Sequence, residues 1–194
     1  GSEMVALTRS AQGLAYPAVA ELVALSVEAR ALLGESCRLS YAADWSEYAG
    51  IQGEGGERIF HLDPLWASAE IDAVAIDWYA PMTDWRDGTG HLDGDLAPGL
   101  HDPAYLAAGL TRGEGYDWYY ASEADRTDQI RTPIHDQAHG EDWIWRVKDL
   151  QGWWSNPHHD RPGGVRSQTP TGWVPRSKPV WLTEIGVPAV DKGT

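Results

Sequence analysis

The most informative segment of the chain is residues 71–79, with the sequence IDAVAIDWY. Its centre is almost entirely apolar, which is typical of a parallel strand that is buried on both faces. It ends in a carboxylate and two aromatic side chains, Asp77, Trp78 and Tyr79. Parallel strands that form a (β/α)₈ barrel carry the active site at their carboxyl ends. The segment therefore predicts a buried parallel strand that ends at a functional site.

Two further segments have the same character. Residues 38–43 (RLSYAA) lead into a polar and aromatic cluster at residues 44–48, and residues 178–184 (KPVWLTE) end in a glutamate. We predict a strand in each. A helix is predicted at residues 17–33, because apolar residues at helical spacing share one face. A proline at the first position and a glycine just after the last support these limits.

Glycine and proline divide the rest of the chain. Residues 50–58 are predicted to form an exposed loop, and residues 81–104 a long loop rich in acids. Helical stretches are predicted near residues 116–129 and 141–154, whereas residues 156–175 are expected to be irregular. Strands that alternate with helices and loops in this way predict an α/β protein with a parallel sheet.

Composition excludes several classes of protein. The chain has 194 residues, with 15 Lys and Arg against 29 Asp and Glu, and its net charge is −14. This acidity argues against a protein that binds nucleic acid or an anionic membrane surface. No apolar run approaches the roughly 18 residues that cross a bilayer, so we expect neither a membrane span nor a signal segment. A single cysteine, Cys37, excludes an internal disulfide and a cysteine-framed zinc site.

The aromatic residues are unevenly distributed by type. There are 11 Trp and 8 Tyr but a single Phe. Indole and phenol rings combine an apolar face with a polar edge, which suits partly wet surfaces such as interfaces and sugar-binding clefts. Two interpretations stay open, a cleft of this kind and a core that uses an unusual number of Trp side chains.

Two glutamates are the candidate catalytic residues. Glycoside cleavage requires two carboxyl groups, one that transfers a proton and one that attacks the sugar or activates water. Glu184 ends an apolar strand, and Glu3 precedes a polar segment and a helix, as a strand-end residue would. The alternatives are a salt-bridged acid at Glu184 and a chain-terminal residue without function at Glu3. Asp44, Glu47 and Asp77 are further carboxylates that either bind a ligand or serve as loop caps and ion-pair partners.

Metal and nucleotide chemistry receive little support. The run His158-His159-Asp160 invites a metal interpretation, but adjacent side chains point apart and no third ligand follows at a standard spacing. The sequence has no Walker loop, no Gly-x-Gly-x-x-Gly fingerprint and no Gly-x-Ser-x-Gly elbow. We therefore expect no cofactor and no metal.

Four runs of sequence resemble a known family. They are residues 41–48 (YAADWSEY), 60–66 (FHLDPLW), 113–120 (GEGYDWYY) and 178–186 (KPVWLTEIG). Together they resemble the glycoside-hydrolase-like TIM-barrel domain of gene transfer agent and phage tail host-specificity proteins, which are baseplate hub proteins. Residues 188–193 are also similar to that family, so the resemblance covers nearly the whole chain.

The resemblance implies a (β/α)₈ barrel related to retaining glycosidases. It places Glu3 at the end of the fourth strand as the acid/base and Glu184 at the end of the seventh strand as the nucleophile. On this matching, residues 1–194 form one domain that runs from the end of strand 4 through strand 7. We therefore expect a partial barrel, a fragment without the N-terminal strands and the last strand.

The resemblance also implies a function. The domain is expected to be a retaining glycoside hydrolase of a tail-tip protein, acting on O-glycosyl bonds of a bacterial envelope polysaccharide or peptidoglycan. Its expected partners are that glycan and other tail or baseplate proteins, and its expected location is the phage-like particle, after synthesis in the bacterial cytoplasm. The side chains expected to contact sugar are Asp44, Trp45, Asp77, Trp78, Tyr79 and Trp181. The alternatives are an inactive structural or receptor-binding tail module on a barrel scaffold, and a lectin-like binder.

Overall fold

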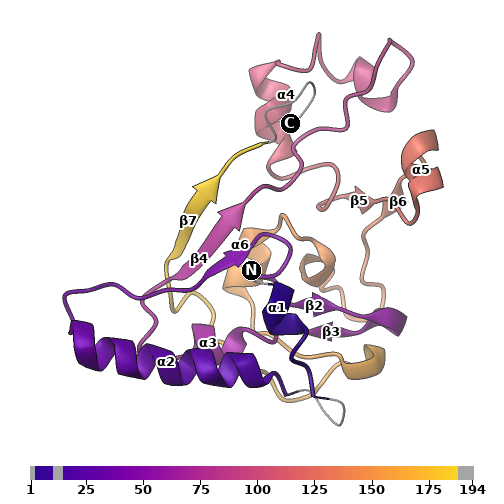
Figure 1. Ribbon diagram of the computed structural model, residues 1–194. Helices are drawn as coiled ribbons and strands as arrows, with labels where there is room; N and C mark the ends of the chain where they lie inside the picture. Colours follow the sequence, from indigo (N-terminus) through magenta and orange to yellow (C-terminus); the bar gives the residue numbers. More distant parts are fainter. Residues whose placement is uncertain (1–2, 11–14, 188–194) are drawn as a thin grey trace. The chain divides into compact units, whose positions relative to one another are not determined.

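A computed structural model describes residues 3–10 and 15–187, with side chains from Val5 onward (Figure 1). The chain forms two compact units. The first contains residues 1–78 and 153–185, and the second contains residues 79–152 and 186–194. The two units are described separately below.

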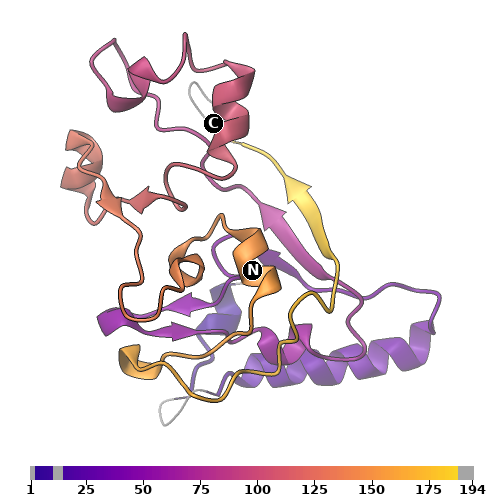
Figure 2. The same ribbon diagram turned by 180° about the vertical axis from the view of Figure 1, so that it is seen from behind.

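The first unit is built on a parallel sheet of three strands. The order is β1 (Ala42–Asp44), β4 (Val74–Trp78) and β7 (Val180–Ile185), with both neighbouring pairs parallel (Figure 2). The central strand β4 is the predicted apolar segment, and its first three residues are fully buried. The three predicted strands are therefore confirmed, although β1 begins four residues later than residue 38.

The sheet is open at β7. Most of this strand is exposed, and Ile185 keeps 69% of its surface accessible. Within residues 3–10 and 15–187 the parallel sheet has three strands and does not close into a barrel. The observed fold is thus mixed α/β with a parallel sheet, which agrees with a partial barrel and not with the full eight-stranded architecture.

The helix α2 spans Pro17–Leu33, which are the predicted limits. Pro17 lies in the first turn, where its missing N–H is not needed. Gly34 ends the helix with a φ of 75°, a conformation that glycine adopts without strain. One side of α2 faces residues 39–41, which precede β1, and the short helix α3 (Asp63–Trp66). Together with Ile71 these segments line a cavity of about 150 Å³.

The prediction of an exposed loop at residues 50–58 is wrong in part. It contains β2 (Ile51–Gln52), a 3₁₀ turn at Glu54–Gly56 and the start of β3 (Arg58–Ile59), and the two strands form an antiparallel hairpin. Each strand has only two residues, which is too short for an alternating pattern to be recognised among glycines. Gly50 has a φ of 103°, and a Cβ there would lie 2.6 Å from the Ile59 carbonyl oxygen.

Several Trp side chains pack in the core of the first unit. Trp66, Trp153 and Trp173 are almost completely buried. Trp153 and Trp173 have ring centroids 4.9 Å apart, and His158 stacks on Trp173 at 5.4 Å. Part of the Trp excess in the sequence is therefore core packing.

The second unit has little regular structure. Its elements are the 3₁₀ turn Leu92–Asp95, α4 (Pro103–Gly109), β5 (Trp118–Tyr119), α5 (Glu123–Asp128), β6 (Thr132–Pro133) and the 3₁₀ turn Asp142–Trp145. The predicted loop at residues 81–104 thus includes one short turn and the start of a helix.

The two predicted helical stretches are shorter than expected. In residues 116–129 only α5 is helical, and residues 118–119 form β5. The helix begins after Ser122, whose hydroxyl accepts a hydrogen bond from the Asp125 N–H and caps the first turn. In residues 141–154, the 3₁₀ turn precedes α6 (Leu150–Ser155). Residues 156–175 are irregular except for a 3₁₀ turn at Pro162–Gly164, as predicted.

One carboxylate ties α2 to the sheet. Asp72, just before β4, accepts hydrogen bonds from the Leu39 N–H and from the guanidinium groups of Arg30 and Arg38, at 2.7–2.8 Å. The Leu39 N–H and the two guanidinium groups hold the pKa of Asp72 well below its usual range. A carboxyl with a depressed pKa in the folded state stabilises that state above its unfolded pKa.

The first prediction concerns the pH dependence of stability. Asp72→Asn should lower the free energy of unfolding at neutral pH. As the pH falls from about 5 toward 1, Asp72 takes up its proton in the unfolded chain before it does so in the folded protein. The wild type therefore loses this contribution, and the difference in free energy of unfolding between the wild type and the variant becomes smaller. Urea unfolding at a series of pH values measures this difference, and a difference that stays constant over this range would contradict the role of Asp72.

A buried contact between a histidine and a carboxylate joins α3 to a distant segment of the chain. His158 Nδ1 lies 2.9 Å from Asp63 Oδ2, and its Nε2 lies 2.8 Å from the Trp153 carbonyl oxygen. Each ring nitrogen of His158 thus lies within hydrogen-bond distance of an acceptor. The Thr171 hydroxyl also donates to Asp63. The pair joins residues 95 positions apart in the chain.

The second prediction is that Asp63→Ala lowers the free energy of unfolding by about 1–3 kcal/mol, because it removes the buried acceptor that faces His158 Nδ1 and the Thr171 hydroxyl. Chemical unfolding measures the change. Asp95→Ala, which removes an exposed carboxylate, is the matched control and should change stability by less than about 0.5 kcal/mol. Equal effects of the two substitutions would show that the buried pair has no special role.

Candidate functional site

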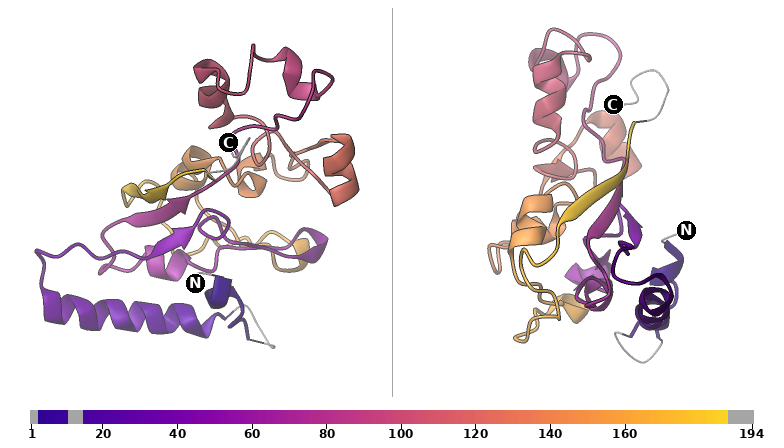
Figure 3. Two further views of the ribbon diagram at one scale, coloured as in Figure 1. Left: turned by 45° about the horizontal axis from the view of Figure 1, so that its top comes forward. Right: turned by 90° about the vertical axis from the view of Figure 1, so that its left-hand side faces the viewer.

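Three carboxylates lie side by side at the carboxyl ends of the three parallel strands. In the sheet register Asp44 of β1 is level with Asp77 of β4, and Asp77 is level with Glu184 of β7. Adjacent strands are about 4.8 Å apart, so the three Cα atoms span about 10 Å. Figure 3 shows β4 and β7 running together to this edge. We call Asp44, Asp77 and Glu184 the carboxylate row.

Asp44 is held by the turn that follows it. Its Oδ1 atom accepts hydrogen bonds from the Ser46 N–H at 2.8 Å and from the Ser46 hydroxyl at 2.5 Å. Among the described residues its Oδ2 atom accepts no hydrogen bond. The carboxylate is therefore oriented through one of its two oxygens.

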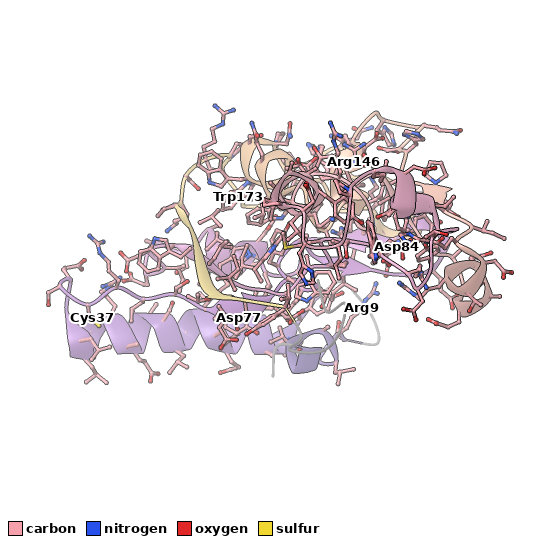
Figure 4. All side chains as sticks on the ribbon, turned by 90° about the horizontal axis from the view of Figure 1, so that it is seen from above. Arg9, Cys37, Asp77, Asp84, Arg146 and Trp173 are labelled. Atoms are coloured by element: carbon pink, nitrogen blue, oxygen red, sulfur yellow. The ribbon has the colours of Figure 1, made fainter. Side chains whose placement is uncertain are left out.

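Asp77 is held in the same way by β7. Its Oδ1 atom accepts a hydrogen bond from the Thr183 hydroxyl at 2.8 Å, and in the described part of the chain its Oδ2 atom accepts none. Figure 4 shows Asp77 beside the end of β7. The contact depends on a β-bulge, because Leu182 is level with Ile76 and Glu184 with Asp77, which makes Thr183 an extra residue.

Glu184 is the predicted nucleophile. It is the second-last residue of β7, and its side chain is exposed. It lies level with Asp77, so the third position of the carboxylate row is on the open edge of the sheet. Three carboxylates in a row make a negative edge that favours ligands with hydrogen-bond donors, such as hydroxyl groups.

The four aromatic side chains that were predicted to contact sugar differ in how exposed they are. Trp45 follows the carboxylate row directly and is half-buried, and its backbone N–H donates to the Asp77 carbonyl oxygen at 3.0 Å. Trp181, in β7, is 40% exposed. Trp78 is only 5% exposed, because its ring packs in the core near Tyr48. Tyr79 is exposed but begins the second unit.

The position of Glu3 is described only by its backbone. Glu3 is the first residue of α1 (Glu3–Ala6). Its side chain lies outside the described residues, so the distance between the carboxyl groups of Glu3 and Glu184 stays a prediction.

Glu47 does not join the carboxylate row. It is buried, with its Oε1 atom 3.6 Å from His61 Nε2, and the Tyr41 hydroxyl donates to Oε2 at 3.4 Å. Burial, together with the nearby Glu47 carboxylate, raises the pKa of Tyr41. Of the carboxylates that the sequence left open, Asp44 and Asp77 are thus at the strand ends and Glu47 is in the interior.

Sequence analysis missed the two residues that orient the row. Ser46 follows Asp44 by two positions, which is a spacing at which a carboxylate commonly caps a turn, so this contact had a weak signal. Thr183 had none, because its contact with Asp77 depends on which strands are neighbours and on the bulge.

The consecutive residues His158, His159 and Asp160 have different partners. His158 bonds to Asp63, His159 Nδ1 lies 2.8 Å from the Ser167 carbonyl oxygen, and Asp160 accepts from the Phe60 N–H at 2.8 Å. In the described part of the chain, no three His, Cys, Asp or Glu side chains are grouped as metal ligands. None of the described helices has the length and apolar character needed to span a bilayer.

A parallel sheet with carboxylates at the carboxyl ends of its strands makes this an α/β protein, the class that includes the barrel enzymes. The family model described as "GTA TIM-barrel-like domain" matches residues 1–194. The chain therefore belongs to this family, which confirms the predicted membership among the gene transfer agent TIM-barrel domains. A comparison with curated proteins gives no match.

The third prediction tests the bond that orients Asp77. Thr183→Val keeps the shape of the side chain but removes its hydroxyl donor, so it should lower the free energy of unfolding by about 0.5–1.5 kcal/mol. Thr183→Ser keeps the donor and is the matched control. Thermal or urea unfolding of the two variants provides the comparison. A Val variant as stable as the wild type would show that the hydrogen bond to Asp77 contributes nothing to stability.

Proposed function

We propose that this domain is a retaining glycoside hydrolase that acts on a polysaccharide of the bacterial envelope, with peptidoglycan as one such substrate. The observation that carries the proposal is the carboxylate row at the carboxyl ends of three neighbouring parallel strands. This is the edge at which barrel enzymes place their chemistry. Membership in the GTA TIM-barrel-like family supports the barrel framework.

Glu184 and Glu3 have complementary roles in the proposed reaction. The Glu184 carboxylate attacks the anomeric carbon while Glu3 protonates the glycosidic oxygen, and the bond from that carbon to the leaving group breaks. Glu3 then removes a proton from water, which attacks the same carbon and releases Glu184 from the ester. This double displacement retains the anomeric configuration, and it requires the two carboxyl groups to lie about 5–5.5 Å apart.

The other two members of the carboxylate row bind sugar in this proposal. Asp44 and Asp77 each have one oxygen held by a hydroxyl donor and a second oxygen without a hydrogen bond from the described residues. Fixed acceptors of this kind suit sugar hydroxyl groups, because little conformational entropy is lost on binding. Trp181 and Trp45 offer the ring faces for stacking, whereas Trp78 supports the strand from the core.

The family context extends the proposal to a setting. We place the domain in the tail tip of a gene transfer agent or phage-like particle, after its synthesis in the bacterial cytoplasm. There it would contact other tail or baseplate proteins and cleave the envelope glycan. The negative charge of the chain agrees with a substrate that is not itself a polyanion such as nucleic acid.

The second candidate function is an inactive structural or receptor-binding tail module. It is favoured by the exposed apolar surface of β7, where Trp181, Leu182 and Ile185 are all accessible. A surface of this kind is typical of a contact with another chain or segment. In this case the carboxylate row would be a remnant and substitution of Glu184 would leave function unchanged.

The fourth prediction separates the two functions. Wild-type domain incubated with purified peptidoglycan and with envelope polysaccharides should release sugars with retained anomeric configuration, as followed by proton NMR of the first product. Glu184→Gln should reduce the rate by about 10³-fold or more, and Glu3→Gln by about 10²–10⁴-fold. Each variant should unfold at the wild-type denaturant concentration.

Glu21→Gln, an exposed substitution on α2, is the matched control and should leave the rate unchanged. Inverted product would contradict the assignment of Glu184 as a nucleophile. Turnover that persists in both Gln variants would contradict the roles assigned to Glu3 and Glu184. A wild type that binds glycan without cleaving it would favour the binding module.

A further inference from the structure

A buried arginine near the tip of the β2–β3 hairpin has no counter-ion among the described residues. Arg58, the first residue of β3, is 2% exposed. Its Nη1 atom donates to the Gly50 carbonyl oxygen at 3.2 Å, but its Nε and Nη2 atoms have no hydrogen-bond partner in the described part of the chain. Burial lowers the pKa of Arg58 to about 10, so the guanidinium group stays charged at neutral pH. A buried charge of this kind destabilises the folded state unless an anion pairs with it.

The two nitrogens without a partner form one edge of the guanidinium group. The N–H groups of Nε and Nη2 are parallel, and together they make the fork that binds a carboxylate through two hydrogen bonds. The Gly50 contact uses Nη1, so it fixes the guanidinium group without occupying this edge. Arg58 therefore presents a complete bidentate donor site for an anion, which we call the Arg58 fork.

A second buried cation lies beside Arg58. The backbone N–H and carbonyl groups of Arg58 and Arg161 bond to each other at 3.2 and 2.6 Å, as in a hydrogen-bonded antiparallel pair. The side chains of such a pair are on the same face, with Cβ atoms about 5 Å apart. Arg161 is 3% exposed. Two positive charges buried side by side favour an anion more than one does, because their attraction is strong where the dielectric constant is low.

The acids next to these two arginines in the sequence have other partners. Glu57 accepts hydrogen bonds from the Arg9 guanidinium group and from the Gly163 N–H. Asp160 accepts from the Phe60 N–H at 2.8 Å. Neither forms an ion pair with the Arg58 fork, so the neighbouring acids do not explain why this charge is buried.

The surroundings of the fork limit the size of a ligand. The hairpin tip at Glu54–Gly56 lies against the turn at Pro162–Gly164, so closely that a Cβ atom on Gly164 would clash with the Gly55 carbonyl oxygen. The Arg58 guanidinium carbon also lies 5.9 Å from the centre of the Phe60 ring. An enclosed site of this kind suits a small anion, because a sugar ring or a peptide segment would have to separate the two turns.

From this geometry we infer that the first unit binds a small carboxylate anion, held by the Nε and Nη2 atoms of Arg58 with Arg161 beside it. The two oxygens of a carboxylate match the two parallel N–H donors, whereas a halide ion accepts both bonds at a single centre. A phosphate dianion carries a second charge that the enclosed site would have to desolvate. Neither arginine belongs to the carboxylate row, so the inference does not depend on the proposed hydrolase.

Thermal unfolding of the full chain tests this inference, with sodium acetate as the probe and sodium chloride at the same ionic strength as the reference. Acetate should raise the unfolding midpoint by about 3–6 °C once its concentration exceeds the dissociation constant about tenfold. Chloride should raise it by less. Carbon-13 NMR of labelled acetate measures binding directly, and we expect a signal of bound acetate in the wild type.

Two substitutions at Arg58 test the fork. Arg58→Met removes it, so acetate and chloride should then give the same midpoint, and the variant should fold because an apolar side chain often replaces a buried charge without loss of stability. Arg58→Lys keeps the charge without the fork and should weaken the acetate effect. Arg112→Met, at an exposed arginine of the second unit, is the matched control and should keep the full effect.

A carboxylate of the chain itself is the competing occupant of the fork. Glu3 and Asp191 are the acidic residues whose side chains lie outside the described part of the chain. If either fills the fork, the wild type will not respond to acetate, and the acetate effect will appear only in Glu3→Gln or Asp191→Asn. That result would overturn the inference that an anion from solution binds here.

Three other results would also overturn it. One is a wild-type midpoint that changes equally with acetate and with chloride. Another is an acetate effect that Arg58→Met retains, because the anion would then bind elsewhere. The third is the absence of a bound signal from labelled acetate in the wild type, a measurement that holds even if Arg58→Met does not fold.

Discussion

Parallel pairing of β4 with a strand on each side is the constraint on which the rest of the first unit depends. Because neighbours run in the same direction, their carboxyl ends meet at one edge, and residues at the ends of separate segments become neighbours. Asp44, Asp77 and Glu184 are up to 140 positions apart in the chain, yet they share this edge. The buried Asp63–His158 pair and the Asp72 contacts hold the helices and loops that keep these strands in place.

Local patterns in the sequence were sufficient for the parts of the fold that depend on local physics. The apolar segment before Asp77 can only be a buried strand, and a proline and a glycine mark both ends of α2. The β2–β3 hairpin was missed because two-residue strands have no recognisable period. The order of the sheet, and therefore the approach of Thr183 to Asp77, depends on contacts between distant segments that no local pattern encodes.

The Trp residues also show what the sequence alone could not predict about the candidate site. Composition alone could not separate a sugar-binding cleft from an aromatic core, and the structure contains both buried and accessible Trp rings. Trp153 and Trp173 pack with His158 in the interior, whereas Trp181 is accessible on β7. Which environment a ring occupies follows from strand register and from the helices above it, and neither is visible from residue type.

The bulge in β7 has a consequence for how this strand can vary. If β7 paired regularly with β4, Thr183 would be level with Asp77 and Glu184 with Trp78, and a shift of one residue turns a side chain to the opposite face of a sheet. The bulge is therefore what keeps Glu184 level with Asp77 while one more residue stands between Leu182 and Glu184. A related sequence that lacks this one residue keeps its glutamate level with the aspartate in a regular register, but it loses the hydroxyl that Thr183 donates to Asp77.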